Sequence, residues 1–383
     1  MYDFIVIGAG IAGASIAYEL ARSSKVCVLE AEDTLGFHAT GRSAALFAPS
    51  YGGREIRAIT RASRDFFNTP PTGFCEQPLL QARGCLYIAR EDQRESLHRM
   101  VREICASGGQ MSLTGASDAI SRVPLLRRDY VADAALDLDA MDIDVDALHQ
   151  GFVRAARALG AVVRINSPVR TARRDGAVWT IGLASDEVRA PVVVNAAGAW
   201  GDDVAEVFGA RPVGLRPLRR TALLVDPPAG CEIGPWPAVI DADEEFYFKP
   251  DAGKILMSPA DETPDRPGDA QPDQMDIAIA VDRVQSALDV AVRRVNHSWA
   301  GLRTFAPDRV PVVGFDSEIP GFFWCAGQGG YGIQTAPAMG RTAAALARRE
   351  PAPTDVLEAG LELDNLSPFR FLAAASAPQR RTN

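Results

Sequence analysis

Three glycines near the start of the chain, Gly8, Gly10 and Gly13, have the spacing GxGxxG, and Glu30 follows seventeen residues later. In a strand–turn–helix unit the first glycine permits a tight bend and the second lets a diphosphate approach the backbone. The third lets the helix pack closely on the sheet. The free N–H groups at the helix start stabilise the negative diphosphate, and a carboxylate at position 30 accepts hydrogen bonds from ribose hydroxyls. The pattern predicts a site for the ADP half of a dinucleotide.

The stretch 41–53, GRSAALFAPSYGG, has neither helical nor strand periodicity and is rich in small, apolar residues. Small residues let main-chain N–H groups approach a flat ring with polar edges. This favours FAD over a nicotinamide dinucleotide, whose proteins usually continue with further alternating strands and helices. From the residues alone, a packed loop without a ligand remains the alternative.

A second glycine-rich loop, 327–332, lies between an apolar run at 322–326 and a helical pattern that follows it. The N-terminus of that helix is suited to stabilise negative charge on a flavin ring. A second nucleotide site is the competing interpretation, but no second strand–helix–strand unit with an acidic residue follows.

Elements that would position these loops can be expected from the sequence pattern. A buried strand is predicted at 4–7 and further strands at 26–29 and 161–165, with a helix from the glycine turn to Arg22. A further helix is predicted to begin at Asp144 and to stop at Gly160. Segments at 219–228, 244–259 and 296–305 are rich in β-formers. The pattern indicates an α/β chain with a Rossmann-like unit and a second, β-rich unit.

Composition excludes several classes of function. The net charge of the 383 residues is −9, which argues against nucleic acid as a partner. The six cysteines show no CxxC pair and are expected to be reduced thiols of a cytoplasmic protein. No run is long enough to cross a membrane, and no signal peptide is seen. The acidic run DLDAMDIDVD lacks the pattern of a calcium loop and is interpreted as a solvated face with a helix cap, so no metal is expected. A tail from about Ala373 is expected to fray.

Taken together, these motifs resemble the D-amino-acid oxidase/glycine oxidase superfamily of FAD-dependent amine oxidoreductases over nearly the whole chain. The likeness looks closest to the bacterial FAD-dependent D-arginine dehydrogenases. The segments that carry it are VIGAGIAGAS, GRSAA, FFNTPPTGFCEQPLL, DIDVDALHQGF, VVNAAGAWGD, FYFKPDAG, WAGLRTF and QGGYGIQTA.

This resemblance implies a doubly wound FAD domain made of residues 1–84, 142–205 and 306–383. A β-sheet substrate domain would comprise residues 85–141 and 206–305. The position of the covalent flavin cysteine of sarcosine oxidases matches Gly301, so FAD is expected to be bound non-covalently. The expected FAD contacts are Gly8, Gly10, Ile11, Ala12, Gly13, Glu30, Ala31, Arg42, Ser43, Ala44, Val169, Ala197, Gly198, Gly330, Tyr331, Gly332, Ile333 and Gln334.

The resemblance also places the substrate. Arg220 and Arg303 match the arginines that bind an amino-acid carboxylate, Tyr247 matches a tyrosine that donates to it, and Tyr51 matches a loop tyrosine that closes the pocket. An arginine fork suits a carboxylate because it binds with two hydrogen bonds and stays charged. From the sequence alone, neighbouring Arg219 is as good a candidate as Arg220.

The activity implied is oxidative deamination of D-amino acids, by hydride transfer to flavin N5 and hydrolysis of the imino acid to a 2-oxo acid and ammonia. A quinone or oxygen would accept the electrons. Two positions depart from the D-arginine dehydrogenases: Leu46 replaces a histidine and Cys85 replaces the glutamate that faces the guanidinium. The expected substrates are therefore neutral or apolar D-amino acids. Oxidation of sarcosine, D-proline or 2-hydroxy acids remains an alternative, and so does a flavin-binding protein without turnover.

Overall fold

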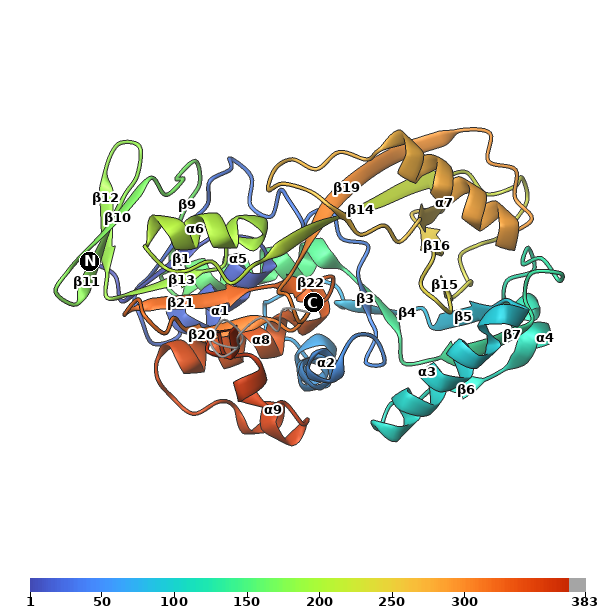
Figure 1. Ribbon diagram of the computed structural model, residues 1–383, viewed down its shortest axis with the longest axis horizontal. Helices are drawn as coiled ribbons and strands as arrows, with labels where there is room; N and C mark the ends of the chain where they lie inside the picture. The colour runs from blue at the N-terminus through green and yellow to red at the C-terminus, as the bar shows by residue number, and fades with distance from the viewer. Residues whose placement is uncertain (372–383) are drawn as a thin grey trace, which may run out of the picture.

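A computed structural model of the chain describes residues 1–371. The predicted fraying of the tail from Ala373 lies outside the described residues. The molecule is elongated, with one sheet toward each end (Figure 1).

The first sheet contains the predicted nucleotide-binding unit. Its strand order is β20-β21-β13-β1-β2-β9, and all neighbours pair in parallel except the edge strand β20. The strands are β1 (Phe4–Ile7), β2 (Val26–Leu29), β9 (Val162–Arg164), β13 (Val192–Asn195), β20 (Val312–Phe315) and β21 (Phe322–Ala326). The predicted strands at 4–7 and 26–29 match β1 and β2, because their continuous apolar runs are buried on both faces.

Different layers cover the two faces of this sheet. One face packs against α1 (Ile11–Ala21), α5 (Val145–Ala158) and α8 (Gly332–Ala347). The other packs against α6 (Gly201–Val207) and an antiparallel sheet of β10 (Thr171–Asp175), β11 (Val178–Gly182) and β12 (Glu187–Ala190). The predicted α/β class with a Rossmann-like unit is confirmed. Asp144 caps α5 as predicted, since its carboxylate accepts from Ala147 N at 2.9 Å.

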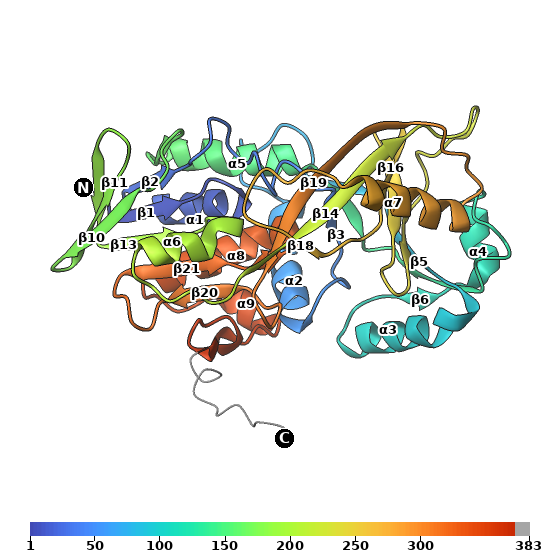
Figure 2. The ribbon, with the colours of Figure 1, turned by 45° about the horizontal axis from the view of Figure 1, so that its top comes forward.

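A larger, mostly antiparallel sheet forms the other end of the molecule. Its order is β22-β19-β14-β17-β16-β15-β5-β7-β6, with β18 pairing on β14. The strands are β5 (Cys85–Ala89), β6 (Ser112–Leu113), β7 (Asp133–Asp137), β14 (Arg216–Val225), β15 (Ala238–Asp241), β16 (Tyr247–Asp251), β17 (Lys254–Ser258), β18 (Thr263–Pro264), β19 (Val295–Phe305) and β22 (Gln328–Gly329). Around it lie α3 (Arg94–Ala106), α4 (Gly115–Arg122) and α7 (Gln274–Ala287) (Figures 1 and 2).

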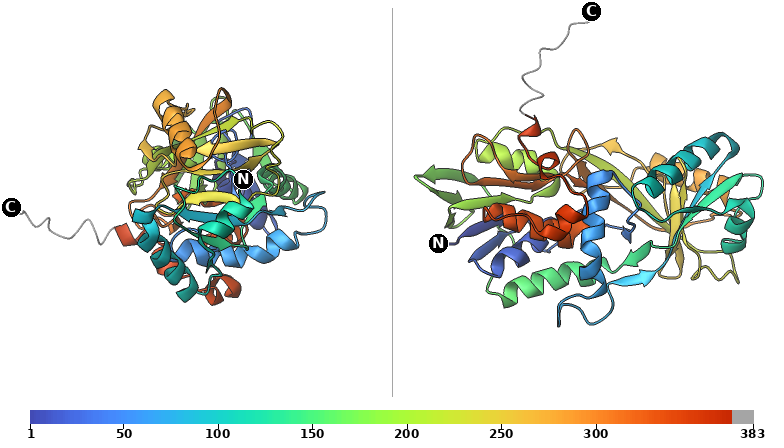
Figure 3. Two further views of the ribbon diagram at one scale, coloured as in Figure 1. Left: turned by 90° about the vertical axis from the view of Figure 1, so that its right-hand side faces the viewer. Right: turned by 90° about the horizontal axis from the view of Figure 1, so that it is seen from below.

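The two ends are joined by long strands and by loops between them. The paired strands β14 and β19 of the larger sheet run side by side into the middle of the molecule (Figure 2). Beneath them lies a small sheet of β3 (Leu46–Phe47), β8 (Met141–Ile143) and β4 (Leu80–Ala82), beside α2 (Arg54–Asn68). Figure 3, right, shows α2 crossing between the two ends. The exact domain boundaries stay a prediction, because β22, from the segment expected in the FAD domain, pairs with β19 of the other unit.

Two features are absent from residues 1–371. No helix there is long and apolar enough to cross a membrane. No group of three or more histidine, cysteine or acidic side chains is arranged to hold a metal ion.

Candidate active site

A single cavity of about 630 Å³ runs from the glycine turn after β1 to the facing strands of the larger sheet. Its wall takes in the loops that the sequence singled out, which are far apart in the chain. They are the turn at 8–12, the end of β2, the segment 36–51, the end of β13 and the loop 326–334. The predicted FAD contacts all lie in this wall except Gly13 and Tyr331.

The glycine turn has the close approaches that its spacing predicted. Gly8 has a φ of +96°, and a Cβ there would lie 2.5 Å from the carbonyl oxygen of Ala196. A Cβ on Gly13 would lie 1.8 Å from the Gly8 oxygen, so α1 can pack against the turn only with glycine at this position. Gly13 therefore shapes the turn from behind and does not line the cavity.

Glu30 at the end of β2 braces this turn. One carboxylate oxygen accepts from Ala9 N at 2.7 Å, and the other accepts from Glu32 N at 3.0 Å. His149, buried on α5, hydrogen-bonds the Ala9 oxygen at 2.8 Å. Burial lowers the pKa of His149, so its neutral ring acts as the donor. Both sides of the turn are thus held by side chains that arrive from other elements.

Replacing Glu30 with alanine should weaken FAD retention while the protein still folds. The change removes a cavity-wall acceptor and leaves two backbone donors without partners, so we expect at least about a tenfold loss of FAD affinity. Glu30→Gln, which keeps one acceptor oxygen, should fall between alanine and wild type. FAD content after purification and calorimetric titration of the apoprotein measure this.

Glu206→Ala serves as the control for this prediction, because Glu206 is exposed on α6 and is not in the cavity wall. Full flavin occupancy and unchanged FAD affinity in Glu30→Ala would remove Glu30 from the cofactor site.

Arg42 is placed differently from the expectation. It lies in the cavity wall, but its guanidinium group donates to the carbonyl oxygens of Ala270 and Ala300, both at 2.8 Å, and pairs with Asp269. Its backbone oxygen accepts from Trp299 Nε1 at 3.0 Å. The side chain therefore fastens the 41–53 loop to β19 and is not free to lie along a diphosphate.

The first turn of α8 offers a donor that nothing in the described chain uses. Gln334 Oε1 accepts from Ala48 N at 3.1 Å, whereas Gln334 Nε2 is buried and has no partner within residues 1–371. Gln334 lies in the cavity wall. A buried donor without a partner is costly, so this atom fits a polar ring edge such as that of a flavin.

Gly301 is the position that matches the covalent flavin cysteine of sarcosine oxidases. It faces Arg42, and no thiol occurs there.

Tyr331 does not line the cavity, so its contact with FAD stays a prediction. Its ring lies against Tyr51, with 5.2 Å between ring centroids, and forms a layer behind it. Gly330, predicted to contact FAD, also lies against Arg303. A Cβ there would lie 2.8 Å from Arg303 Nη1, so this glycine makes room for the arginine.

The polar end of the cavity brings together Arg220, Arg303, Tyr247 and Tyr51. Arg220 pairs in register with Gly301, so Arg220 and Arg303 lie on the same face of the β14–β19 ladder. Desolvation alone would raise the pKa of Tyr247, but the two guanidinium groups bring it below its ordinary value. Desolvation raises the pKa of Tyr51 despite the nearby Arg303, so Tyr51 stays a neutral donor.

Arg219 is on the opposite face, as strand alternation requires. It pairs with Asp276 at 2.9 Å and with Asp265 at 3.5 Å, away from the cavity. The structure therefore distinguishes between two arginines that the sequence alone left equivalent.

The rest of this end of the cavity is an apolar pocket. Leu46, Cys85, Tyr87 and Ile240 line it, and burial raises the pKa of both Cys85 and Tyr87, which keeps them neutral. Tyr87 was not foreseen, although it lies two residues after Cys85 and strand alternation puts both on one face. On the neighbouring strand, Asp137 is buried behind Cys85 and accepts from the Ser50 hydroxyl, which anchors the loop that carries Tyr51.

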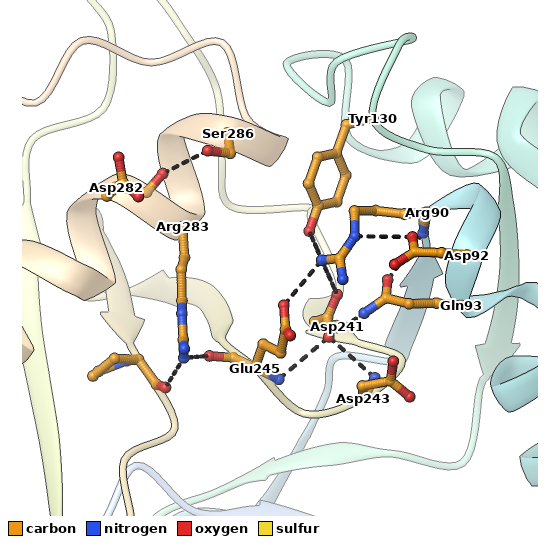
Figure 4. A network of polar contacts seen from close by, with 11 residues as sticks. Arg90, Asp92, Gln93, Tyr130, Asp241, Asp243, Glu245, Asp282, Arg283 and Ser286 are labelled. Carbon is orange, nitrogen blue, oxygen red and sulfur yellow. Dashed lines mark hydrogen bonds and ion pairs between the residues drawn. The ribbon is translucent and has the colours of Figure 1, made fainter.

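Acidic residues near β15 and β16 could have placed a charge in this pocket. Among residues 1–371, none of Glu76, Asp241, Asp243, Glu244 and Glu245 lines the cavity. Asp241 is fully buried in a separate network, where it accepts from Gln93 Nε2 at 3.0 Å, and Glu245 pairs with Arg90 at 2.9 Å (Figure 4). Glu244 is exposed at the turn that this network holds, and its charge acts on Tyr51 and Cys85 from the rim.

Comparison with known proteins identifies the family. Residues 3–346 match the family described as FAD dependent oxidoreductase (DAO). The chain belongs to this family. It is an FAD-dependent oxidoreductase.

The individual relatives share only about a quarter or less of their residues with this chain. Glycine oxidase from Bacillus subtilis is 26% identical over 377 residues, which cover 94% of this chain and 96% of the relative. The structure of glycine oxidase from Geobacillus kaustophilus has a TM-score of 0.82 at 21% identity and covers 96% of this chain and 98% of that one. L-Proline dehydrogenase from P. horikoshii has a TM-score of 0.84 at 20% identity, with 97% and 98% covered. The likeness to the two structures shows the shared fold. The nearer resemblance to D-arginine dehydrogenases stays a prediction.

Proposed function

We propose that this oxidoreductase deaminates D-amino acids to 2-oxo acids and ammonia, with a preference for neutral or apolar side chains. The proposal rests on one observation: Arg220 and Arg303 line the same cavity as an uncharged pocket next to them. Two arginines on one strand face suit a carboxylate, and the neutral Cys85 and Tyr87 suit an apolar side chain.

The chain's own residues bind and orient the substrate. Arg303 and Arg220 would hold the carboxylate, with Tyr247 and Tyr51 donating to it, while Leu46 and Cys85 contact the side chain. The glycine turn, Glu30 and the segment 327–334 would hold FAD, which would supply a two-electron acceptor, and a quinone or oxygen would finally take up the electrons. Positioning and the exclusion of water are the tasks left to the protein. The imino product then adds water and releases ammonia.

Because its pKa is raised, Tyr51 is poorly suited to remove a proton from the substrate ammonium near neutral pH. It acts in this proposal as a hydrogen-bond donor and as a wall of the pocket.

Secondary and cyclic amines form the competing class, because the similar structures include a proline dehydrogenase as well as a glycine oxidase. An anaerobic panel of D- and L-amino acids, glycine, sarcosine, D-proline and 2-hydroxy acids distinguishes them, with bleaching of the yellow flavin band as the readout. Fast bleaching by D-amino acids with neutral side chains is expected. Faster bleaching by sarcosine, proline, L-amino acids or 2-hydroxy acids would overturn the proposal, and no bleaching by any compound would point to a flavin-binding protein without turnover.

A further inference from the structure

The carboxylate of Glu262 lies between an arginine of the cavity and one outside it. It forms a two-point pair with Arg309, at 2.8 Å to Nη2 and 2.9 Å to Nη1. Its contact with Arg220 Nη2 is longer, at 3.4 Å. The Arg309 pair lowers the pKa of Glu262, so the carboxylate is ionised at neutral pH.

Arg220 keeps donors available for a ligand. Its Nε donates to the carbonyl oxygen of Asp261 at 2.8 Å, and Asp261 is itself held by the backbone N–H of Thr221 at 2.7 Å. Within residues 1–371, no partner is found for Arg220 Nη1, although the side chain is only 10% exposed. Nε is therefore anchored to the backbone and Nη2 contacts Glu262, whereas Nη1 is left for a ligand of the cavity that Arg220 lines.

Arg309 is fixed in place by contacts of its own. Its guanidinium carbon lies 3.9 Å from the centre of the Phe305 ring. Its backbone has a φ of +63°, a conformation that costs free energy for a non-glycine residue and persists where surrounding contacts enforce it. The residue does not line the cavity, so it cannot act by touching a ligand there.

We propose that Arg309 is a positioning residue that keeps the Glu262 carboxylate in a two-point pair and limits it to one long contact with Arg220, so that Arg220 can bind the carboxylate of the substrate. The inference rests on the proposed function for the nature of that ligand. Without Arg309, Glu262 would have Arg220 as its nearest cation and would compete with the substrate for it. Without the charge of Glu262, the field at Arg220 would become more positive and favour an anion.

The two members of this ion pair should therefore change ligand binding in opposite directions. We expect Arg309→Met to weaken binding of 4-methyl-2-oxopentanoate, the 2-oxo acid derived from leucine, by about five- to tenfold, and Glu262→Gln to tighten it by about two- to fivefold. Calorimetric titration of the holoenzyme measures both Kd values. In steady-state assays KM should follow Kd, whereas kcat should stay within about twofold.

Matched variants separate this role from a structural one. Arg309→Lys should recover part of the binding, since an ammonium group can still pair with Glu262. The double variant Glu262→Gln/Arg309→Met should bind like Glu262→Gln. Arg370→Met is the control. It breaks a two-point pair with Asp308, the residue before Arg309, and should keep the wild-type Kd. If both single variants weaken binding alike, or if Arg309→Met binds like wild type, the inference is wrong.

A crystal structure of the Arg309→Met holoenzyme tests the inference independently of the substrate. Glu262 should be found closer to Arg220 than in wild type, where the Oε1–Nη2 distance is 3.4 Å. Glu262 in its original place, or turned to solvent, would overturn the inference even if D-amino acids are oxidised. Failure of wild type to bind the 2-oxo acid or to oxidise D-amino acids would instead count against the proposed function, and this crystal structure would still decide the role of Arg309.

Discussion

Replacing Arg303 with alanine is expected to lower kcat/KM for D-amino acids by about 10²-fold or more, because a charge-assisted contact of this kind contributes roughly 3 kcal/mol. Arg303 lies half-buried in the cavity wall, beside Tyr51 and Tyr247 and against the bare backbone of Gly330. Desolvation alone would lower the pKa of Arg303, but the two tyrosines help to raise it, so its charge is secure.

Arg303→Lys should restore only part of the activity, because an ammonium group lacks the planar fork. Amino-acid esters, which lack the carboxylate, should be poor substrates of the wild-type enzyme. Steady-state kinetics of each variant, with its FAD content measured alongside, show whether the loss concerns the substrate or the cofactor.

Arg219→Ala is the matched control for Arg303→Ala. Arg219 belongs to the strand that pairs with that of Arg303, but it faces Asp265 and Asp276 on the other side of the sheet. We expect near-normal kcat/KM with some loss of thermal stability. Near-normal kinetics in Arg303→Ala itself would remove Arg303 from the substrate site.

Local patterns in the sequence were sufficient to predict the nucleotide-binding unit. The turn at Gly8–Gly13 and the strands on either side of it depend on backbone geometry that only glycine and apolar runs allow, so residue type alone indicates them. The resemblance to a known family also predicted that distant loops line one shared cavity.

Side-chain partners in three dimensions could not be predicted in this way. The guanidinium group of Arg42 turns to Ala270 and Ala300, more than two hundred residues away, and no local signal reveals that choice. Arg219 and Arg220 are indistinguishable until the register of β14 is known. Glu262 and Arg309 are 47 residues apart, and their pair depends on how the chain returns beside β14.

The substrate preference is the second large effect that we expect. The kcat/KM values should rank D-leucine, D-methionine, D-phenylalanine and D-valine above D-arginine and D-lysine. A cationic side chain that enters the pocket loses water, and removing the partner of a desolvated charge typically costs several kcal/mol. Cys85, held neutral by burial, offers no compensation, whereas Leu46 adds apolar surface worth about 0.8 kcal/mol per buried methylene group.

Two engineered changes test which residues determine this preference. Cys85→Glu combined with Leu46→His should shift the ranking toward D-arginine, and no shift would mean that these two positions do not contact the substrate side chain. Glu244 at the rim is the remaining acidic candidate, since its charge acts on Tyr51 and Cys85. If Glu244 only borders the entrance, Glu244→Gln leaves the ranking unchanged. If wild type ranks D-arginine first and Glu244→Gln abolishes that rank, the rim carboxylate, and not the apolar wall, determines specificity, and the predicted preference is wrong.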